Sequence, residues 1–328
     1  MLVRERRERA VEATVSRESE ADAEAQALRA WVERLAVPRH RWANRAANAR
    51  CRDVLAESLT RLGWEVRLQG PHRNVVAIPR RGRGPLRVVG AHYDTVPESP
   101  GADDNASGLA VMLEAARALA QDEACERVAF VAFNAEEDGL LGSRDLVANG
   151  LSIFERRLEV VHVLEMLGFR ARGEAQSLPL PWVPASLRSP DFLGLLSRHA
   201  ANAALDRIVR SEASPDVRLL GAKTWGPLER LLPDLARSDH FPFWDAGLPA
   251  VLWTDTGNFR NPHYHQRTAK AVKDAQERVN KLAEDGRKQI QSAAEGVQKG
   301  AEKAVNDVKG AKKPEKKAEK KDTKKDAA

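Results

Sequence analysis

Apolar residues along the chain switch between helical and strand spacing, which predicts a sheet flanked by helices. The clearest helix covers residues 105–119, and two earlier helices cover residues 28–35 and 44–62. Short apolar or alternating runs predict strands over residues 64–68, 74–79, 88–92, 128–133, 158–164 and 249–254. This succession of helices and strands indicates an α/β domain in which a mixed sheet has helices on both faces.

The middle of the chain, residues 170–237, has a weaker pattern. Prolines interrupt residues 179–190, as in a loop, and the spacing predicts a helix over residues 191–205. Residues 225–233 are loop-like. Irregular insertions of this kind often form the walls of a pocket, so we expect this region to line one.

The composition changes abruptly after residue 268, which sets the predicted domain boundaries. Apolar positions over residues 269–309 repeat every eleven residues, as in Val279, Ile290 and Ala301, and this period matches a nearly straight helix. The last stretch is Lys-rich and typical of a disordered, solvating tail. We therefore predict a charged extension over residues 1–25, a main domain over 26–268, an amphipathic helix over 269–309 and a disordered tail over 310–328.

The basic character of the protein belongs to its C-terminal part. The net charge is +6 and the pI about 9.4. Residues 266–328 carry 18 Lys and Arg against 11 Asp and Glu, which leaves residues 1–265 with a net charge of −1. Such a tail could contact anionic surfaces. A solvated tail is the simpler interpretation, so we expect no specific nucleic-acid partner, and no pattern here sets an oligomeric state.

Cysteine usage and hydropathy bear on the compartment. Cys51 and Cys125 form neither a disulfide framework nor a CxxC metal motif, which indicates two free thiols. The first residues contain no apolar stretch of a secretory signal, and no window of 18 apolar residues predicts a transmembrane segment. These features favour a soluble cytoplasmic protein.

Polar, chemically active side chains follow three of the predicted buried strands. Strand 88–92 ends in His92 and continues to Asp94, and acidic residues come directly after strands 128–133 and 158–164. A solvated loop explains one such ending easily but explains three poorly. Because open α/β sheets bind ligands at the carboxyl ends of their strands, we expect these side chains to share one edge.

The side chains collected at this edge form a set of metal ligands. The candidates are His92, Asp104, Glu137, Glu165 and His265. Two imidazoles and three carboxylates suit zinc, and one carboxylate can bridge two ions about 3.5–4 Å apart. Glu136 precedes a candidate ligand, so it lies near the metal while pointing elsewhere, as suits a proton acceptor.

Six motifs follow one another in the order in which they occur in a known protein family. They are His-x-Asp, Gly-Ala-Asp-Asp-Asn-x-Ser-Gly, Glu-Glu-Asp-Gly-Leu-x-Gly-Ser, Glu-Met-Leu-Gly, Ser-Asp-His-x-Pro-Phe-Trp and His-Tyr-His. Over residues 28–265 the sequence resembles the M28 family of co-catalytic zinc aminopeptidases. The resemblance implies a three-layer sandwich with a mixed, mostly parallel sheet. It also implies a metallopeptidase that hydrolyses N-terminal residues from peptide substrates.

The resemblance implies two Zn²⁺ ions bridged by Asp104. His92, Asp104 and Glu165 would hold one ion, and Asp104, Glu137 and His265 the other. Each of these positions matches a ligand position of the family motifs.

The resemblance also assigns the remaining site residues. Glu136 would be the general base and then the general acid, and Asp94 would orient the ring of His92. Asp239 and His240 would line the site near the substrate.

Some choices and departures affect this assignment. Asp104 directly precedes Asn, as the family bridge does, so we expect Asp103 to cap the following helix. His265 rather than His263 follows Tyr. Glu165 stands where many members carry Asp, and its longer side chain would reshape the pocket near the substrate amine.

After His265 the chain passes straight into the 11-residue repeat, so the closing amphipathic helix that usually follows the last histidine of the family is absent or replaced. Three alternatives therefore stay open: a single-zinc glutaminyl cyclase-like acyl transferase, a non-catalytic binding protein on the same fold, and a protein whose tail binds lipid or nucleic acid. His162 is expected to be an ordinary sheet histidine rather than a ligand.

Overall fold

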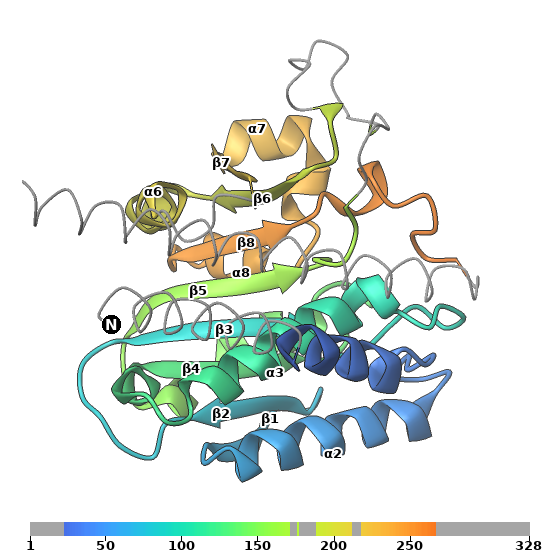
Figure 1. The fold of residues 1–328 in the computed structure, drawn as a ribbon. Coiled ribbons are helices and arrows are strands. Elements are labelled where there is room, and N and C mark those ends of the chain that lie inside the picture. Colours follow the sequence, from blue (N-terminus) through green and yellow to red (C-terminus); the bar gives the residue numbers. More distant parts are fainter. Residues whose placement is uncertain (1–22, 171–175, 177–187, 212–217, 267–328) are drawn as a thin grey trace, which may run out of the picture.

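A computed structural model of the protein describes residues 23–170, 176, 188–211 and 218–266. These residues form an eight-stranded sheet in the order β1-β2-β4-β3-β5-β8-β6-β7 (Figure 1). The strands are β1 Glu65–Gln69, β2 Asn74–Ile78, β3 Leu86–His92, β4 Val128–Phe133, β5 Leu158–Glu165, β6 Phe192–Ser197, β7 Arg218–Lys223 and β8 Ala250–Thr254.

The middle of the sheet is parallel and its flanks are mixed. Strands β4, β3, β5 and β8 run parallel to one another, whereas β1 and β2 add antiparallel strands on one side. On the other side β6 is antiparallel to β8 and parallel to β7. The predicted α/β class with a mixed, mostly parallel sheet is confirmed.

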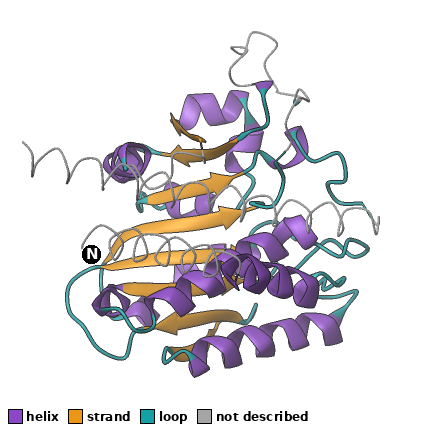
Figure 2. Cartoon of the chain, in the orientation of Figure 1, coloured by secondary structure: helices purple, strands orange, loops and turns teal. Residues whose placement is uncertain are grey.

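Helices cover both faces of this sheet (Figure 2). A helix over residues 23–35, α2 (Arg45–Arg61), α3 (Gly108–Leu119) and α6 (Asn202–Arg210) lie on one face. Short helices, among them α4 (Leu141–Asp145) and α8 (His240–Asp245), lie on the other, and α7 (Gly226–Leu231) lies beyond the β6–β7 end.

Burial on both faces explains the apolar strands. Every residue of β4 is buried, because α2 and α3 cover one of its faces and a second core covers the other. A parallel strand buried on both sides is read in sequence as a continuous apolar run, as Val128–Phe133 is. The strands and helices predicted over residues 44–164, and the strand over residues 249–254, are confirmed to within about three residues. The helix predicted over residues 28–35 is also present, but it already includes residue 23.

The prediction of a helix over residues 191–205 is wrong in its first half. Phe192–Ser197 forms strand β6, and helix α6 begins only at Asn202. A six-residue apolar run fits a buried strand as well as a helix, and pairing with β7 and β8 decides for the strand. The stretch expected to be loop-like contains α7, which has Pro227 in its first turn, where proline is well tolerated.

Other predictions concern composition rather than the sheet. Cys51 and Cys125 are free thiols, as expected. Among the described residues, no helix is long and apolar enough to cross a bilayer. Residues 1–22 of the predicted extension, the 269–309 helix and the 310–328 tail lie outside the described residues.

Candidate active site

The predicted ligands come together where three parallel strands end. His92 is the last residue of β3 and Glu165 the last of β5, while Glu137 follows β4 by four residues. Because β4, β3 and β5 are neighbours that run in the same direction, these side chains share one edge of the sheet. Asp104 and His265 reach this edge from loops.

Asp104 lies between two histidines. The Nε2 atom of His92 is 3.0 Å from Asp104 Oδ1 and 3.5 Å from Glu165 Oε2. On the other side, His265 Nε2 is 3.1 Å from Asp104 Oδ2 and 3.3 Å from Glu137 Oε2. Within each group of three residues, the ligand atoms all lie within 4.8 Å of one another. Asp104 therefore offers one oxygen to each group.

The buried polar atoms of the first group suit a cation. His92 Nε2 and Asp104 Oδ1 are buried and form no hydrogen bond with any residue that the structure describes. Buried polar atoms without a partner are uncommon and costly, unless an ion satisfies them. Imidazole nitrogen and carboxylate oxygen are donors that zinc accepts, so both groups have a suitable donor set.

Asp94 connects His92 to the loop that carries Glu136 and Glu137. Its side chain is fully buried, with Oδ1 3.6 Å from His92 Nδ1. The two carboxylate oxygens accept the backbone N–H groups of Glu136 and Glu137 at 3.1 and 3.2 Å. His92 Nδ1 donates to the backbone carbonyl of Asp94 at 3.2 Å, which leaves Nε2 of the neutral ring available to a metal ion.

The neighbours of Asp104 pin its loop in place. Asn105 donates to the backbone carbonyl of Leu164 at 2.8 Å, and its oxygen accepts the N–H of Gly108. Asp103 accepts from Gly168 N at 2.9 Å and from the side-chain amide of Asn261 at 2.6 Å. The expectation that Asp103 caps the helix is therefore wrong, because α3 begins only at Gly108 and Asp103 bonds to other loops.

The buried side chain of Arg39 also stabilises these loops. Arg39 is fully buried, and its guanidinium donates to the backbone carbonyls of Tyr93, Pro100 and Gly101 at 2.7, 2.8 and 3.1 Å. These carbonyls lie in the segment that connects His92 to Asp104. No periodic or motif signal separates Arg39 from the other basic residues, so the sequence reasoning missed it.

The crowding of buried carboxylates raises their affinity for protons or cations. Burial, with the neighbouring Asp104, raises the pKa of Glu137 to about 7. Burial, aided by Glu165 and Asp239, raises the pKa of Glu136 well above its usual range. Although burial alone would lower it, Asp104 and Glu137 raise the pKa of His265 to about 9. A site with this much uncompensated negative charge favours a bound cation.

Asp239 and His240 lie beneath the site rather than in it. Both are fully buried, and His240 Nε2 donates to the Leu235 carbonyl at 2.9 Å. Their neighbours Arg237 and Ser238 are the residues that reach the pocket described next. Neither Asp239 nor His240 lines that pocket, and the expectation that they contact substrate stays a prediction.

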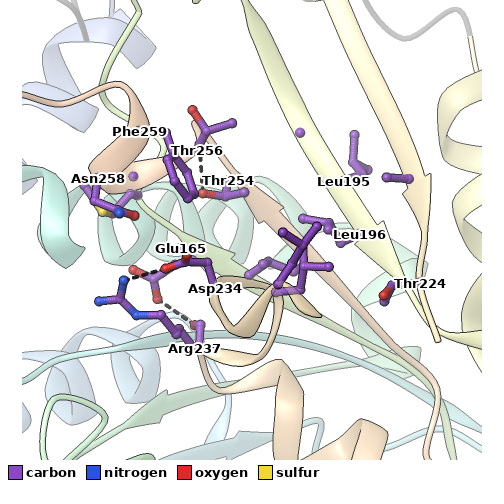
Figure 3. Close-up of a pocket in the computed structure, with 18 of the residues that line it drawn as sticks. Glu165, Leu195, Leu196, Thr224, Asp234, Arg237, Thr254, Thr256, Asn258 and Phe259 are labelled. Carbon is purple, nitrogen blue, oxygen red and sulfur yellow. Dashed lines mark hydrogen bonds and ion pairs between the residues drawn. The ribbon is translucent and has the colours of Figure 1, made fainter. Parts of the chain in front are cut away.

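An apolar pocket opens beside Glu165 and Glu136 (Figure 3). Its volume is about 410 Å³. Its walls come mainly from β6, β7, β8 and α7, including Phe192, Leu195, Leu196, Leu220, Leu228 and Leu252. The expectation that the region 170–237 lines a pocket is confirmed for its described residues.

Arg237 is one of two cationic side chains, with Lys223, in the lining of this pocket. Arg237 donates to Asp234 at 2.8 Å and to the hydroxyl of Tyr264 at 3.1 Å. The Tyr264 ring in turn stacks on His265, with centroids 3.7 Å apart. Glu165 Oε2 accepts a hydrogen bond from Ser238 at 2.7 Å, which fixes the longer side chain noted in the sequence.

A comparison with known families agrees with this geometry. The model of peptidase family M28 matches residues 74–284. The chain belongs to peptidase family M28. An uncharacterised Escherichia coli protein, YfbL, is 34% identical over 211 residues, which are 60% of this chain and 63% of that protein. The Bacillus subtilis aminopeptidase YwaD is 32% identical over 202 residues, 59% of this chain and 38% of YwaD.

The chain spans less than two thirds of the length of these relatives. Solved structures share its fold. Legionella pneumophila LapA aminopeptidase superposes with a TM-score of 0.57 at 17% identity, covering 82% of this chain and 75% of LapA. Porphyromonas gingivalis glutaminyl cyclase superposes with a TM-score of 0.54 at 20% identity, covering 79% and 97%.

The M28 match leaves out part of the structural support. It begins at residue 74 and contains every candidate ligand, but Arg39 and Asn48 precede it. Asn48 donates to the Arg39 carbonyl at 2.9 Å and to the side chain of Asn134 at 3.0 Å. Arg39 and helix α2 are therefore part of the framework of the site.

Proposed function

We propose that this M28 protein is a zinc-dependent aminopeptidase with two zinc ions, His92, Asp104 and Glu165 holding one and Asp104, Glu137 and His265 the other. The observation that carries the proposal is the position of Asp104, whose two oxygens each face one histidine and one further carboxylate. When bound, zinc supplies Lewis-acid polarisation of the peptide carbonyl and of water.

Glu136 is the proposed proton-transfer residue. It lines the pocket beside the ligand groups without belonging to either of them. Its raised pKa, caused first by burial, suits a carboxylate that accepts a proton from the attacking water. The same carboxyl group then returns that proton to the nitrogen of the leaving amine. Asp94 keeps Glu136 and His92 in register by binding the backbone of one and the ring of the other.

The pocket supports an exopeptidase that accepts apolar N-terminal residues. Its acidic end, near Glu136 and Glu165, suits the positive α-amino group of a free N-terminus. Its leucine-lined walls suit a large apolar side chain. A cavity of about 410 Å³ leaves room for such a side chain next to the scissile bond.

The test combines metal analysis with hydrolysis of leucyl and N-acetyl-leucyl chromogenic substrates by the full chain. We expect two zinc ions per chain, chelator-sensitive hydrolysis of the leucyl substrate and none of the blocked one. His265→Ala should lose one zinc ion and about 100-fold or more in activity. His263→Ala, the matched control, should keep both ions and its rate within about twofold.

Two results would contradict the proposal. One zinc ion per chain with cyclisation of N-terminal glutamine would establish the acyl transferase alternative. Two bound ions without hydrolysis of any aminoacyl substrate would indicate a binding protein on this fold.

A further inference from the structure

Helix α7 forms one wall of the apolar pocket, yet it belongs to none of the hydrophobic cores that the described residues build. Leu228 and Leu232, at the end of this helix, line the cavity. Both are only half-buried, and neither packs against a core cluster of the described residues. Because these leucines face open space on one side, apolar contacts fix the position of α7 only weakly.

The buried residue of α7 is a glutamate. Among the six residues of this helix only Glu229 is buried, and its side chain is 5% exposed. Both of its carboxylate oxygens accept from the guanidinium of Arg198: Nε donates to Oε1 at 2.8 Å, and Nη2 donates to Oε2. A pair with two parallel hydrogen bonds fixes orientation as well as distance. An ion pair therefore holds a helix that apolar packing leaves loose.

The other partner of this pair is anchored in the body of the domain. Arg198 directly follows β6, whose Leu195 and Leu196 also line the pocket. Its Nη1 atom donates to the backbone carbonyl of Trp244 in α8 at 2.9 Å. Trp244 is a core residue, and its indole donates to the carbonyl of Ala250 at the start of β8. The guanidinium thus connects α7 to the end of β6 and to the core.

We propose that the Arg198–Glu229 pair sets the width of the pocket and so selects the N-terminal residue of the substrate; this inference rests on the proposed aminopeptidase function. Neither residue lines the cavity, so both are positioning residues rather than substrate contacts. With the pair formed, Leu228 and Leu232 contact a large aliphatic side chain such as that of leucine. Without it, α7 moves away and these contacts weaken, whereas the metal side is unchanged.

Steady-state kinetics of Glu229→Gln test the proposal, because this change keeps the size of the side chain and removes its charge. For a leucyl substrate, KM should rise about fivefold or more while kcat stays within about twofold. An alanyl substrate, whose methyl group does not reach the wall, should change by less than about twofold in both constants. Asp206→Asn is the matched control: it also removes one negative charge near the pocket, but from the exposed pair with Lys223, and should leave all constants within about twofold.

A double-variant cycle tests whether the two residues act as one unit. Arg198→Gln leaves the Glu229 carboxylate buried without its partner, so its effect on the leucyl KM should be at least as large as that of Glu229→Gln. Adding Glu229→Gln to this variant should raise KM no further. Effects that multiply in the double variant would show that the two side chains act separately, and would overturn the proposal.

Hydrogen–deuterium exchange of the full chain gives a readout that needs no substrate. In Glu229→Gln, the amides of residues 226–232 should exchange about tenfold faster or more, whereas those of β5 should keep the parent rate. Unchanged exchange in α7, or an equal loss of kcat for leucyl and alanyl substrates, would overturn the proposal. A parent chain that hydrolyses no aminoacyl substrate would instead overturn the proposed function, and the exchange rates would still decide whether the pair holds α7.

Discussion

The two sides of the candidate active site are held by different forces. On the metal side, the ligands are fixed by hydrogen bonds: Glu137 Oε1 accepts the N–H of Val96 at 3.2 Å, and Glu165 accepts the Ser238 hydroxyl. On the pocket side, β6, β7 and α7 present mostly leucines, and the end of β7 is exposed. Under the proposed function, reaction chemistry depends on a rigid polar network, whereas substrate selection depends on the shape of an apolar wall.

This contrast between the metal side and the pocket side indicates where substitutions are tolerated. A polar network in a buried site loses its function when one member is changed, because the remaining groups are left unpaired. An apolar wall changes its volume by small steps and keeps its fold. We expect changes on the metal side to abolish activity and changes on the pocket side to alter the choice of substrate.

The largest effect is expected for Glu136→Gln, which keeps the shape of the side chain and removes its proton acceptor. The value of kcat should fall by about 10²–10⁴-fold, with unchanged zinc content. Steady-state kinetics and elemental analysis measure both. Glu123→Gln, on an exposed turn, is the control. A residual rate within about tenfold of the parent would assign the proton transfer to another group.

Asp94→Asn should have the next largest effect, because one amide oxygen cannot replace two carboxylate oxygens that bind Glu136 and Glu137. Zinc affinity should fall by about 10–100-fold. Competition with a chelator of known affinity measures this change. If the affinity stays the same, the rigid network does not depend on Asp94, and the contrast between the two sides weakens.

On the pocket side, Leu220→Trp should fill part of the cavity. For a leucyl substrate, kcat/KM should fall by about 10-fold or more, whereas an alanyl substrate should change by less than about threefold. The alanyl substrate thus serves as the internal control, since it shares the chemistry but not the side chain. A similar loss for both substrates would show that the wall also supports the metal side.

The smallest effect concerns the scaffold beneath the two sides. Burial lowers the pKa of both His162 and His240 to about 4, from an ordinary value of 6.5. At each of these two histidines the unfolded chain therefore binds a proton that the folded chain does not bind, and the stability that each histidine contributes falls as the pH drops from about 6.5 towards 4. Between pH 8 and pH 6 the loss should be about 1 kcal/mol for each histidine.

Urea unfolding at several pH values measures this loss. Relative to the parent, His162→Gln should lose about 1 kcal/mol less of its stability between pH 8 and pH 6. An unchanged dependence would mean that the Trp253 indole, which donates to His162 Nδ1 at 3.2 Å, does not keep that ring neutral.

The sequence predicted the metal side better than the pocket side. His92 and Glu165 end apolar runs and Glu137 follows one by four residues, so strand periodicity predicts that they share one edge, and the structure places them there. The run of β6 lacks such a signal, because six apolar residues fit a strand or a helix equally well. The inward turn of Asp239 and His240 depends on how α8 packs, which a one-dimensional pattern does not contain.

Arg39 bears on how far this site could be transplanted into another protein. A graft of residues 74–284 would carry every candidate ligand and also Glu136. It would leave behind Arg39, whose guanidinium binds three carbonyls of the segment between His92 and Asp104. The ligands and their support are thus encoded in separate parts of the chain, and only a graft that begins before Arg39 is a portable unit.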